Sequence, residues 1–153
     1  MEFASIEREL YIDASPEIVF EVVSRPEHVS QWWPDEASYS VSPGAVGKIS
    51  FGDAGPDRKT ETLTVVDVRP PSSFSFRWIH PTDEAAREGN SLLVTFELSP
   101  SGSGTLLKFT ETGFREMGWE AAVLEETYND HTNGWNFFLP RLAPYAATVG
   151  ARP

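Results

Sequence analysis

The first third of the chain predicts one strand followed by two short helices. Residues 6–12 alternate apolar and polar side chains, which is typical of a strand. Ser15 is a good N-cap, and Pro16 suits the first position of the helix that follows. A second short helix is expected after Pro26 and ends before Pro34.

Strand patterns then dominate as far as residue 112. Residues that are apolar or β-branched at alternate positions predict further strands at 39–41, 46–51, 60–68 and 74–78. A polar, acidic loop is expected over residues 80–90. Residues 91–112 predict a hairpin that turns at Ser101–Gly104. Because strands and helices are segregated along the chain, we expect an α+β fold with an antiparallel sheet.

The last segment, from about Trp119 to Ala147, has the spacing of one long helix. Side chains that recur every three or four residues would form a single inward face. They are Leu124, Tyr128, His131, Trp135, Phe138, Leu142 and Tyr145. Gly134 weakens this helix, and we expect it to permit close approach of the helix to the sheet.

Composition and charge narrow the class of protein. A chain of 153 residues fits a single domain, which we place at residues 1–150. The absence of cysteine excludes disulfides and thiolate chemistry, and a net charge of -11 disfavours nucleic acid. The N-terminus lacks signal-peptide features, and no apolar run is long enough to enter a membrane. We therefore expect a cytoplasmic protein.

Aromatic residues are abundant, with five Trp, four Tyr and ten Phe. They can form a solid core or line a ligand cavity, and both interpretations stay open. The candidate cavity-lining residues are Trp32, Trp33, Phe51, Phe76, Trp78, Phe96, Phe109, Tyr128, His131, Trp135 and Phe138.

Three polar residues are candidates for chemistry inside such a cavity. Arg8 and Glu111 have the strand parity of apolar neighbours, so they could pair there, because a buried charge needs a partner. Alternatively, a bulge reverses the parity or both residues lie at exposed strand ends. His131 has three possible roles: a core histidine whose ring nitrogens bond to a neighbour, a polar contact for a ligand, or a general base. The sequence identifies no acid to orient it.

Other chemistry has no support in the sequence. The three histidines, His28, His80 and His131, are far apart and form no metal-ligand motif. No phosphate-binding glycine loop or nucleophilic serine motif is present. We therefore predict no metal, no cofactor and no catalytic residue.

Several short motifs occur in an order that resembles a known family. They are residues 12–20, Gln31–Trp33, residues 42–47, residues 111–114 and Gly134–Trp135. Together they resemble the START-like (SRPBCC) superfamily, and within it the family of homologues of the activator of heat-shock-chaperone ATPase. The resemblance implies a helix-grip fold, in which six or seven curved antiparallel strands wrap a long C-terminal helix and two short helices follow the first strand. A cavity between sheet and helix is also implied.

The leading functional hypothesis is non-enzymatic binding of a small hydrophobic or amphipathic ligand in that cavity. One alternative is an enzyme of the cyclase or hydrolase kind that uses His131, Arg8 and Glu111. A second alternative is a stress-related protein-interaction module, and a homodimer is possible. The eukaryotic co-chaperone contacts its chaperone through a separate N-terminal domain, so chaperone contact is not the leading expectation here.

Overall fold

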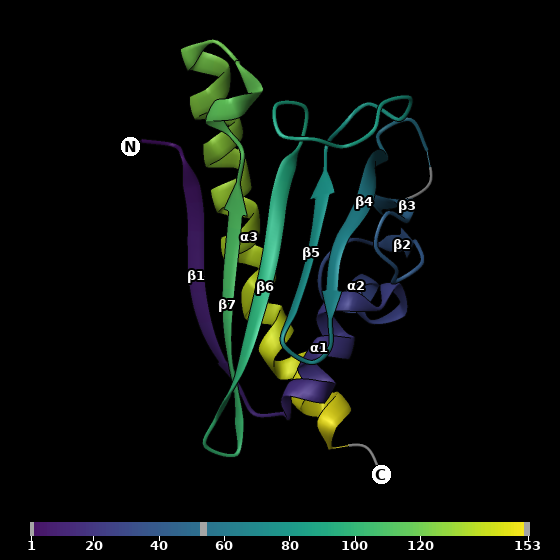
Figure 1. The fold of residues 1–153 in the computed structure, drawn as a ribbon, viewed down its shortest axis with the longest axis vertical. Coiled ribbons are helices and arrows are strands. Elements are labelled where there is room, and N and C mark those ends of the chain that lie inside the picture. Colours follow the sequence, from purple (N-terminus) through teal and green to yellow (C-terminus); the bar gives the residue numbers. More distant parts are fainter. Residues whose placement is uncertain (1, 53–54, 152–153) are drawn as a thin grey trace.

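The computed structural model describes residues 2–52 and 55–151. Seven strands form one antiparallel sheet in the order β1-β7-β6-β5-β4-β3-β2 (Figure 1). The strands are β1 (Ser5–Ile12), β2 (Glu36–Ser38), β3 (Val46–Phe51), β4 (Lys59–Arg69), β5 (Ser73–Trp78), β6 (Leu92–Ser101) and β7 (Gly104–Thr112). The helices are α1 (Pro16–Ser24), α2 (Pro26–Trp32), α3 (Ala121–Gly150) and a short 3-10 helix at Arg115–Met117. This arrangement confirms the predicted helix-grip architecture.

The two short helices begin and end where the sequence predicts. The Ser15 side chain accepts a hydrogen bond from the backbone N–H of Ile18 at 3.3 Å, and this bond caps α1. The indole of Trp32 donates to the carbonyl of Val22 at 3.0 Å, so α2 is fastened to α1 through a buried contact. The pair covers one end of the sheet (Figure 1).

The strand predicted at residues 39–41 is wrong, because the strand of this region is β2, three residues earlier. Ser38 pairs with Lys48 of β3, and the ladder stops there. The Tyr39 side chain turns toward α1, where its hydroxyl donates to the carbonyl of Ser24 at 2.6 Å. Apolar residues after β2 thus anchor a loop, although their alternation suggested a strand.

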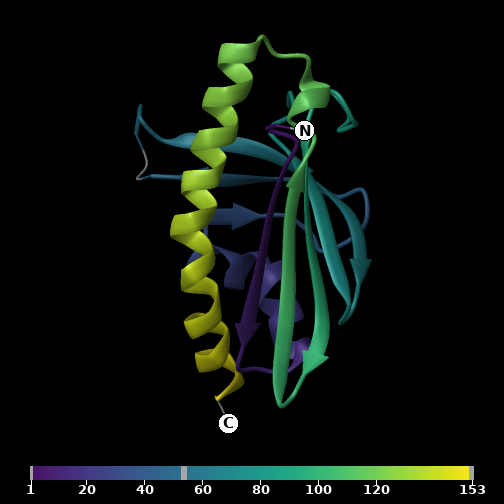
Figure 2. The same ribbon diagram turned by 90° about the vertical axis from the view of Figure 1, so that its left-hand side faces the viewer.

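The predicted hairpin at residues 91–112 is confirmed. β6 and β7 pair from Leu93–Thr112 to Ser101–Gly104, and Gly102 in the turn has a φ of 58°, which favours glycine. In β4 the register shifts between Val65 and Asp67. A bulge of this kind bends a strand, and the sheet curves toward α3 (Figure 2).

The C-terminal helix α3 lies along the inner face of this sheet (Figure 2). It begins two residues later than predicted and extends three residues further, to Gly150. The predicted inward face is confirmed, because its members are buried or pack against the core. Within the described part of the chain, no helix is long and apolar enough to cross a membrane.

Candidate functional site

The aromatic residues predicted to line a cavity pack mostly against one another. Trp33 lies at the centre of this cluster, with ring centroids 5.9 Å from Phe51, 5.6 Å from Phe76, 5.0 Å from Trp78 and 4.8 Å from Trp135. These spacings are those of direct aromatic contact. The rings therefore fill most of the space between α3 and the sheet, where we expected an open cavity.

Two small clefts of about 100 Å³ each remain beside α3, and Trp135 lines both. One, which we call the His131 cleft, is walled mainly by aromatic rings. Its lining residues are Trp33, Phe51, Trp78, Asp130, His131, Gly134, Trp135 and Phe138. The other, which we call the Arg8 cleft, lies toward β1 and is lined by Arg8, Leu10 and Asn136 among others.

A fully buried carboxylate lies behind the His131 cleft. Glu111 of β7 has an exposed fraction of 0%. Its Oε2 accepts a hydrogen bond from the indole of Trp78 at 2.7 Å, and its Oε1 accepts one from the indole of Trp135 at 2.8 Å. His131 Nδ1 lies 2.9 Å from the same Oε1. Three nitrogens from two elements therefore satisfy a charge that would otherwise be costly to bury.

His131 connects this buried carboxylate to the cleft. Its side chain is 13% exposed, and its ring packs at 5.3 Å from Trp78 and 5.5 Å from Phe114. Among residues 2–52 and 55–151, its Nε2 has no hydrogen-bond partner. The acid that orients His131, which the sequence did not identify, is Glu111.

The predicted Arg8–Glu111 pair is not formed. Both side chains face inward as their parity indicated, but β1 pairs with β7 so that Ile6 lies opposite Glu111 and Arg8 lies opposite Phe109. Arg8 instead donates from Nε to the Asn136 side chain of α3 at 3.1 Å. The two predicted polar residues therefore belong to different clefts.

Gly134 also behaves differently from expectation. A Cβ atom built at this position would have no heavy atom within 4 Å, so the glycine does not serve a close approach of helix and sheet. Glycine inside a helix costs about 1 kcal/mol relative to alanine. Since Gly134 lines the His131 cleft, its missing side chain leaves open space there.

Two further acidic groups lie near His131. Asp130 lies on its wall, one residue before His131. Glu61 of β4 shares the inward parity of Leu63 and Val65 and is half-buried. Burial raises the pKa of the Glu61 carboxyl above its ordinary value, and the nearby charges of His131 and Lys59 lower that pKa in part. The surroundings of His131 are therefore acidic and disfavour an anionic ligand.

Besides a hollow of about 510 Å³ along Ser38–Ser40 and Val46–Lys48, two others that exceed these clefts lie elsewhere on the described surface. A groove of about 700 Å³ runs between α1 and the β4–β5 turn, and we call it the α1 groove. Phe20, Val41 and Val68 give it an apolar lining, but the hydroxyl of its buried Ser24 already donates to the Phe20 carbonyl at 2.6 Å. Within the described part of the chain, no buried side-chain polar atom of this groove lacks a hydrogen-bond partner.

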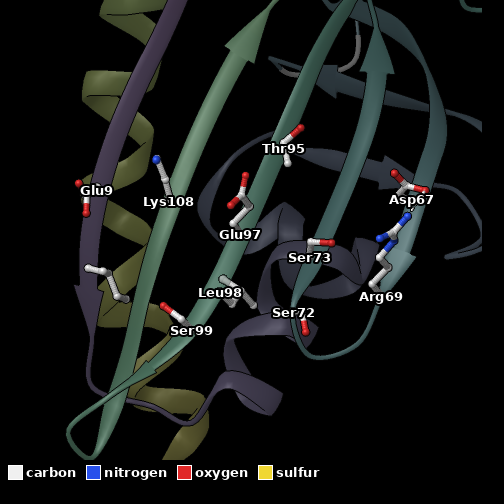
Figure 3. A pocket seen from close by; sticks show the side chains of 11 residues that line it. Glu9, Asp67, Arg69, Ser72, Ser73, Thr95, Glu97, Leu98, Ser99 and Lys108 are labelled. Carbon is white, nitrogen blue, oxygen red and sulfur yellow. Dashed lines mark ion pairs between the residues drawn. The ribbon is translucent and has the colours of Figure 1, made fainter.

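The second hollow is a depression of about 490 Å³ on the outer face of the sheet (Figure 3). Charged side chains of both signs and several serines line it, including Glu97, Lys108 and the ion pair of Arg69 with Asp67 at 4.0 Å. Small-molecule sites are mostly apolar and concave, so this polar face is a weaker candidate.

No group of three or more His, Asp or Glu side chains among the described residues could hold a metal ion.

The sequence identified the polar residues His131 and Glu111 but did not predict that they pair with each other. Gly134, Asp130 and Glu61 were missed altogether as site residues. A glycine inside an otherwise continuous helical stripe was the available signal for Gly134.

Comparisons with known proteins agree with this fold. The crystal structure of protein MLL2253 from Mesorhizobium loti superposes with a TM-score of 0.73 at 21% identity, covering 92% of this chain and 95% of that one. The solution structure of the Aha1 dimer from Colwellia psychrerythraea has a TM-score of 0.70 at 19% identity, covering 97% and 98%.

DynU16, described as a putative protein in the dynemicin biosynthetic locus, has a TM-score of 0.70 at 22% identity. The match covers 96% of this chain but 48% of DynU16. At these identities the structures show the fold alone, and no curated protein sequence matches the chain.

The sequence itself carries the assignment to a family. The model of the family described as "Activator of Hsp90 ATPase homolog 1-like protein" matches residues 13–147, which is most of the chain. The protein therefore belongs to the family of proteins like activator of Hsp90 ATPase homolog 1.

Proposed function

We propose that this protein binds a small, predominantly apolar molecule in the His131 cleft and does not transform it. One observation carries the proposal: the buried Glu111–His131 pair opens onto an aromatic-walled space that Gly134 leaves unfilled. Ligand sites are typically apolar and contain a few well-placed polar groups, and this cleft has that character.

The size of the cleft limits the ligand. A volume of about 100 Å³ is below the roughly 300 Å³ of drug-sized pockets, and an apolar cavity of about 150 Å³ accommodates benzene. Because the cleft is smaller than that cavity, even a single ring requires its walls to move slightly apart. A larger amphipathic ligand requires the Trp33 and Phe138 rings to turn aside or α3 to move from the sheet.

An enzymatic role is the second candidate, because Glu111 supplies the orienting acid. A histidine that is held by a carboxylate and lines a cleft has the arrangement of a general base. Arg8 would take no part, since it lies in the other cleft. Release of product from a bound ring-sized ester, lost in His131→Gln while binding persists, would favour this role over binding alone.

The remaining expectations rest on the family. A chaperone-linked role stays a prediction, and so does a homodimer, although the Aha1 relative from Colwellia psychrerythraea was solved as a dimer. Light scattering at increasing protein concentration measures the oligomeric state directly.

The binding proposal is tested with toluene, which has the size of one ring and no polar group. Trp33, Trp78 and Trp135 line the cleft, so bound toluene should change tryptophan fluorescence and raise the melting temperature. A Gly134→Leu variant should lose both responses because its side chain occupies the space.

The matched control is Val41→Trp, which fills the α1 groove instead. It should respond to toluene like the wild type. A toluene response that persists in Gly134→Leu but disappears in Val41→Trp would place binding in the α1 groove and overturn the proposal.

A further inference from the structure

The hydrogen bonds of Glu111 determine which atom of His131 meets a ligand. Indole nitrogens only donate, so Trp78 makes Oε2 an acceptor and Trp135 makes Oε1 an acceptor. With Glu111 ionised, the hydrogen in the 2.9 Å contact with His131 is supplied by Nδ1. When the imidazole is neutral, its lone pair is therefore on Nε2.

The direction of the ring places that lone pair away from the buried carboxylate. The two nitrogens of an imidazole point in divergent directions, and Nδ1 is held by Glu111. The His131 side chain is 13% exposed and forms part of the cleft wall. Nε2 is thus the hydrogen-bonding atom that His131 offers to a molecule in the cleft.

The other walls select the rest of the ligand. The rings of Trp33, Trp78 and Phe138 provide flat faces for stacking a planar ring. Asp130 on α3, Glu61 on β4 and Glu111 on β7 are the acidic groups that surround His131. These negative charges repel a carboxylate ligand, whereas a neutral group that donates a hydrogen bond meets no such penalty.

We propose that the His131 cleft selects a planar ring bearing a weakly acidic hydroxyl, a phenol or an enol, whose O–H donates to His131 Nε2. This inference rests on the proposed ligand-binding function and adds the chemical class of the ligand. No bond other than the hydrogen bond forms, and the proton stays within the hydroxyl–imidazole pair.

Three ring-sized probes that differ in one group test the selection. They are 4-methylphenol, 4-methylanisole, in which a methyl group blocks the hydroxyl, and 4-methylbenzoate, which is anionic. Titration calorimetry at about pH 8, where an ordinary imidazole and an alkyl phenol are both neutral, should give about tenfold tighter binding of the phenol than of the anisole, the value of one good hydrogen bond. The benzoate should bind most weakly.

The residue responsible is identified with His131→Phe in a Glu111→Leu background, which removes the buried carboxylate together with its partner. The preference for phenol over anisole should fall to about onefold, while anisole still binds. If this variant does not fold, the imidazole ¹⁵N resonances of wild-type His131 replace it: Nε2 should shift with 4-methylphenol and remain unchanged with 4-methylanisole.

The outcomes separate the two proposals. If no probe binds, the ligand-binding function itself is wrong. If the phenol and the anisole bind equally, or neither changes the Nε2 resonance, the cleft binds rings but His131 does not select a hydroxyl group. Tightest binding of the benzoate would also overturn the selection, because it would show a site for anions.

Discussion

Gly134 allows the sharpest test of the site, because stability and binding should respond to its replacement in different ways. An added Cβ atom meets no heavy atom within 4 Å, so nothing has to shift to accommodate Gly134→Ala. The variant should therefore gain the full helix-propensity difference of about 1 kcal/mol in the free energy of unfolding. For a domain of this size, that gain corresponds to a melting temperature about 2–4 °C higher.

A longer side chain at the same position extends the argument to function. Leucine has a helix propensity close to that of alanine, so Gly134→Leu should be at least as stable as the wild type. Its side chain fills the His131 cleft, and toluene binding should disappear. Urea denaturation and toluene titration of both variants measure the two effects independently.

Gly150 provides the matched control for the alanine substitution. It also lies in α3, but its added Cβ would approach the Ala14 Cβ at 3.3 Å, a tight contact. Gly150→Ala should therefore gain less stability than Gly134→Ala and should leave ligand binding unchanged. Destabilisation by Gly134→Ala would show that the space beside residue 134 is not open. Undiminished toluene binding in Gly134→Leu would show that toluene does not bind in the His131 cleft.

Three other predictions concern the polar groups. Glu111→Gln should lose about 1–3 kcal/mol in urea denaturation, because its NH₂ group must face at least one N–H donor, whereas Glu97→Gln on the exposed face should change little. Glu61→Gln should stabilise the protein at neutral pH and lose that advantage in mild acid. Because the pKa of Glu61 is raised in the folded protein, wild-type stability is lost as the pH rises through that pKa, and glutamine avoids this loss. Equal effects of the substitution at both pH values would contradict this reasoning. Tyr39→Phe should cost about 0.5–1.5 kcal/mol, measured in the same way.

The sequence predicted the elements whose own pattern determines them. The hairpin of β6 and β7 has regular alternation and a glycine turn, so local information was sufficient. The strand placed at residues 39–41 failed because the Tyr39 side chain satisfies its hydroxyl on Ser24 of α1, a partner fifteen residues away. Alternation of apolar and polar residues indicates that some side chains are buried. It does not indicate whether those residues belong to a paired strand or to a loop.

The sequence predicted which face of the sheet the polar residues occupy, but not which residues of neighbouring strands lie opposite each other. Arg8 and Glu111 both point inward as expected, yet Arg8 lies opposite Phe109, two residues along β7 from Glu111. Two residues of strand span about 7 Å, which is beyond a direct ion pair. The partners that Glu111 does find lie 20 to 33 residues away on α3 and β5. Only the curvature of the sheet and the position of α3 bring them together.

The free energy of folding supports a functional interpretation of these residues. An apolar residue at position 111 would avoid the desolvation of a buried carboxylate, and buried ion pairs are often replaceable by packed apolar groups without loss of stability. Alanine at position 134 would likewise favour the helix. Both departures from the most stable choice adjoin His131: Glu111 contacts its Nδ1, and Gly134 lines the same cleft. Natural proteins depart from such local preferences mainly at functional sites. Here the two departures, a buried carboxylate and a glycine inside a helix, leave one oriented imidazole beside an open space among aromatic rings.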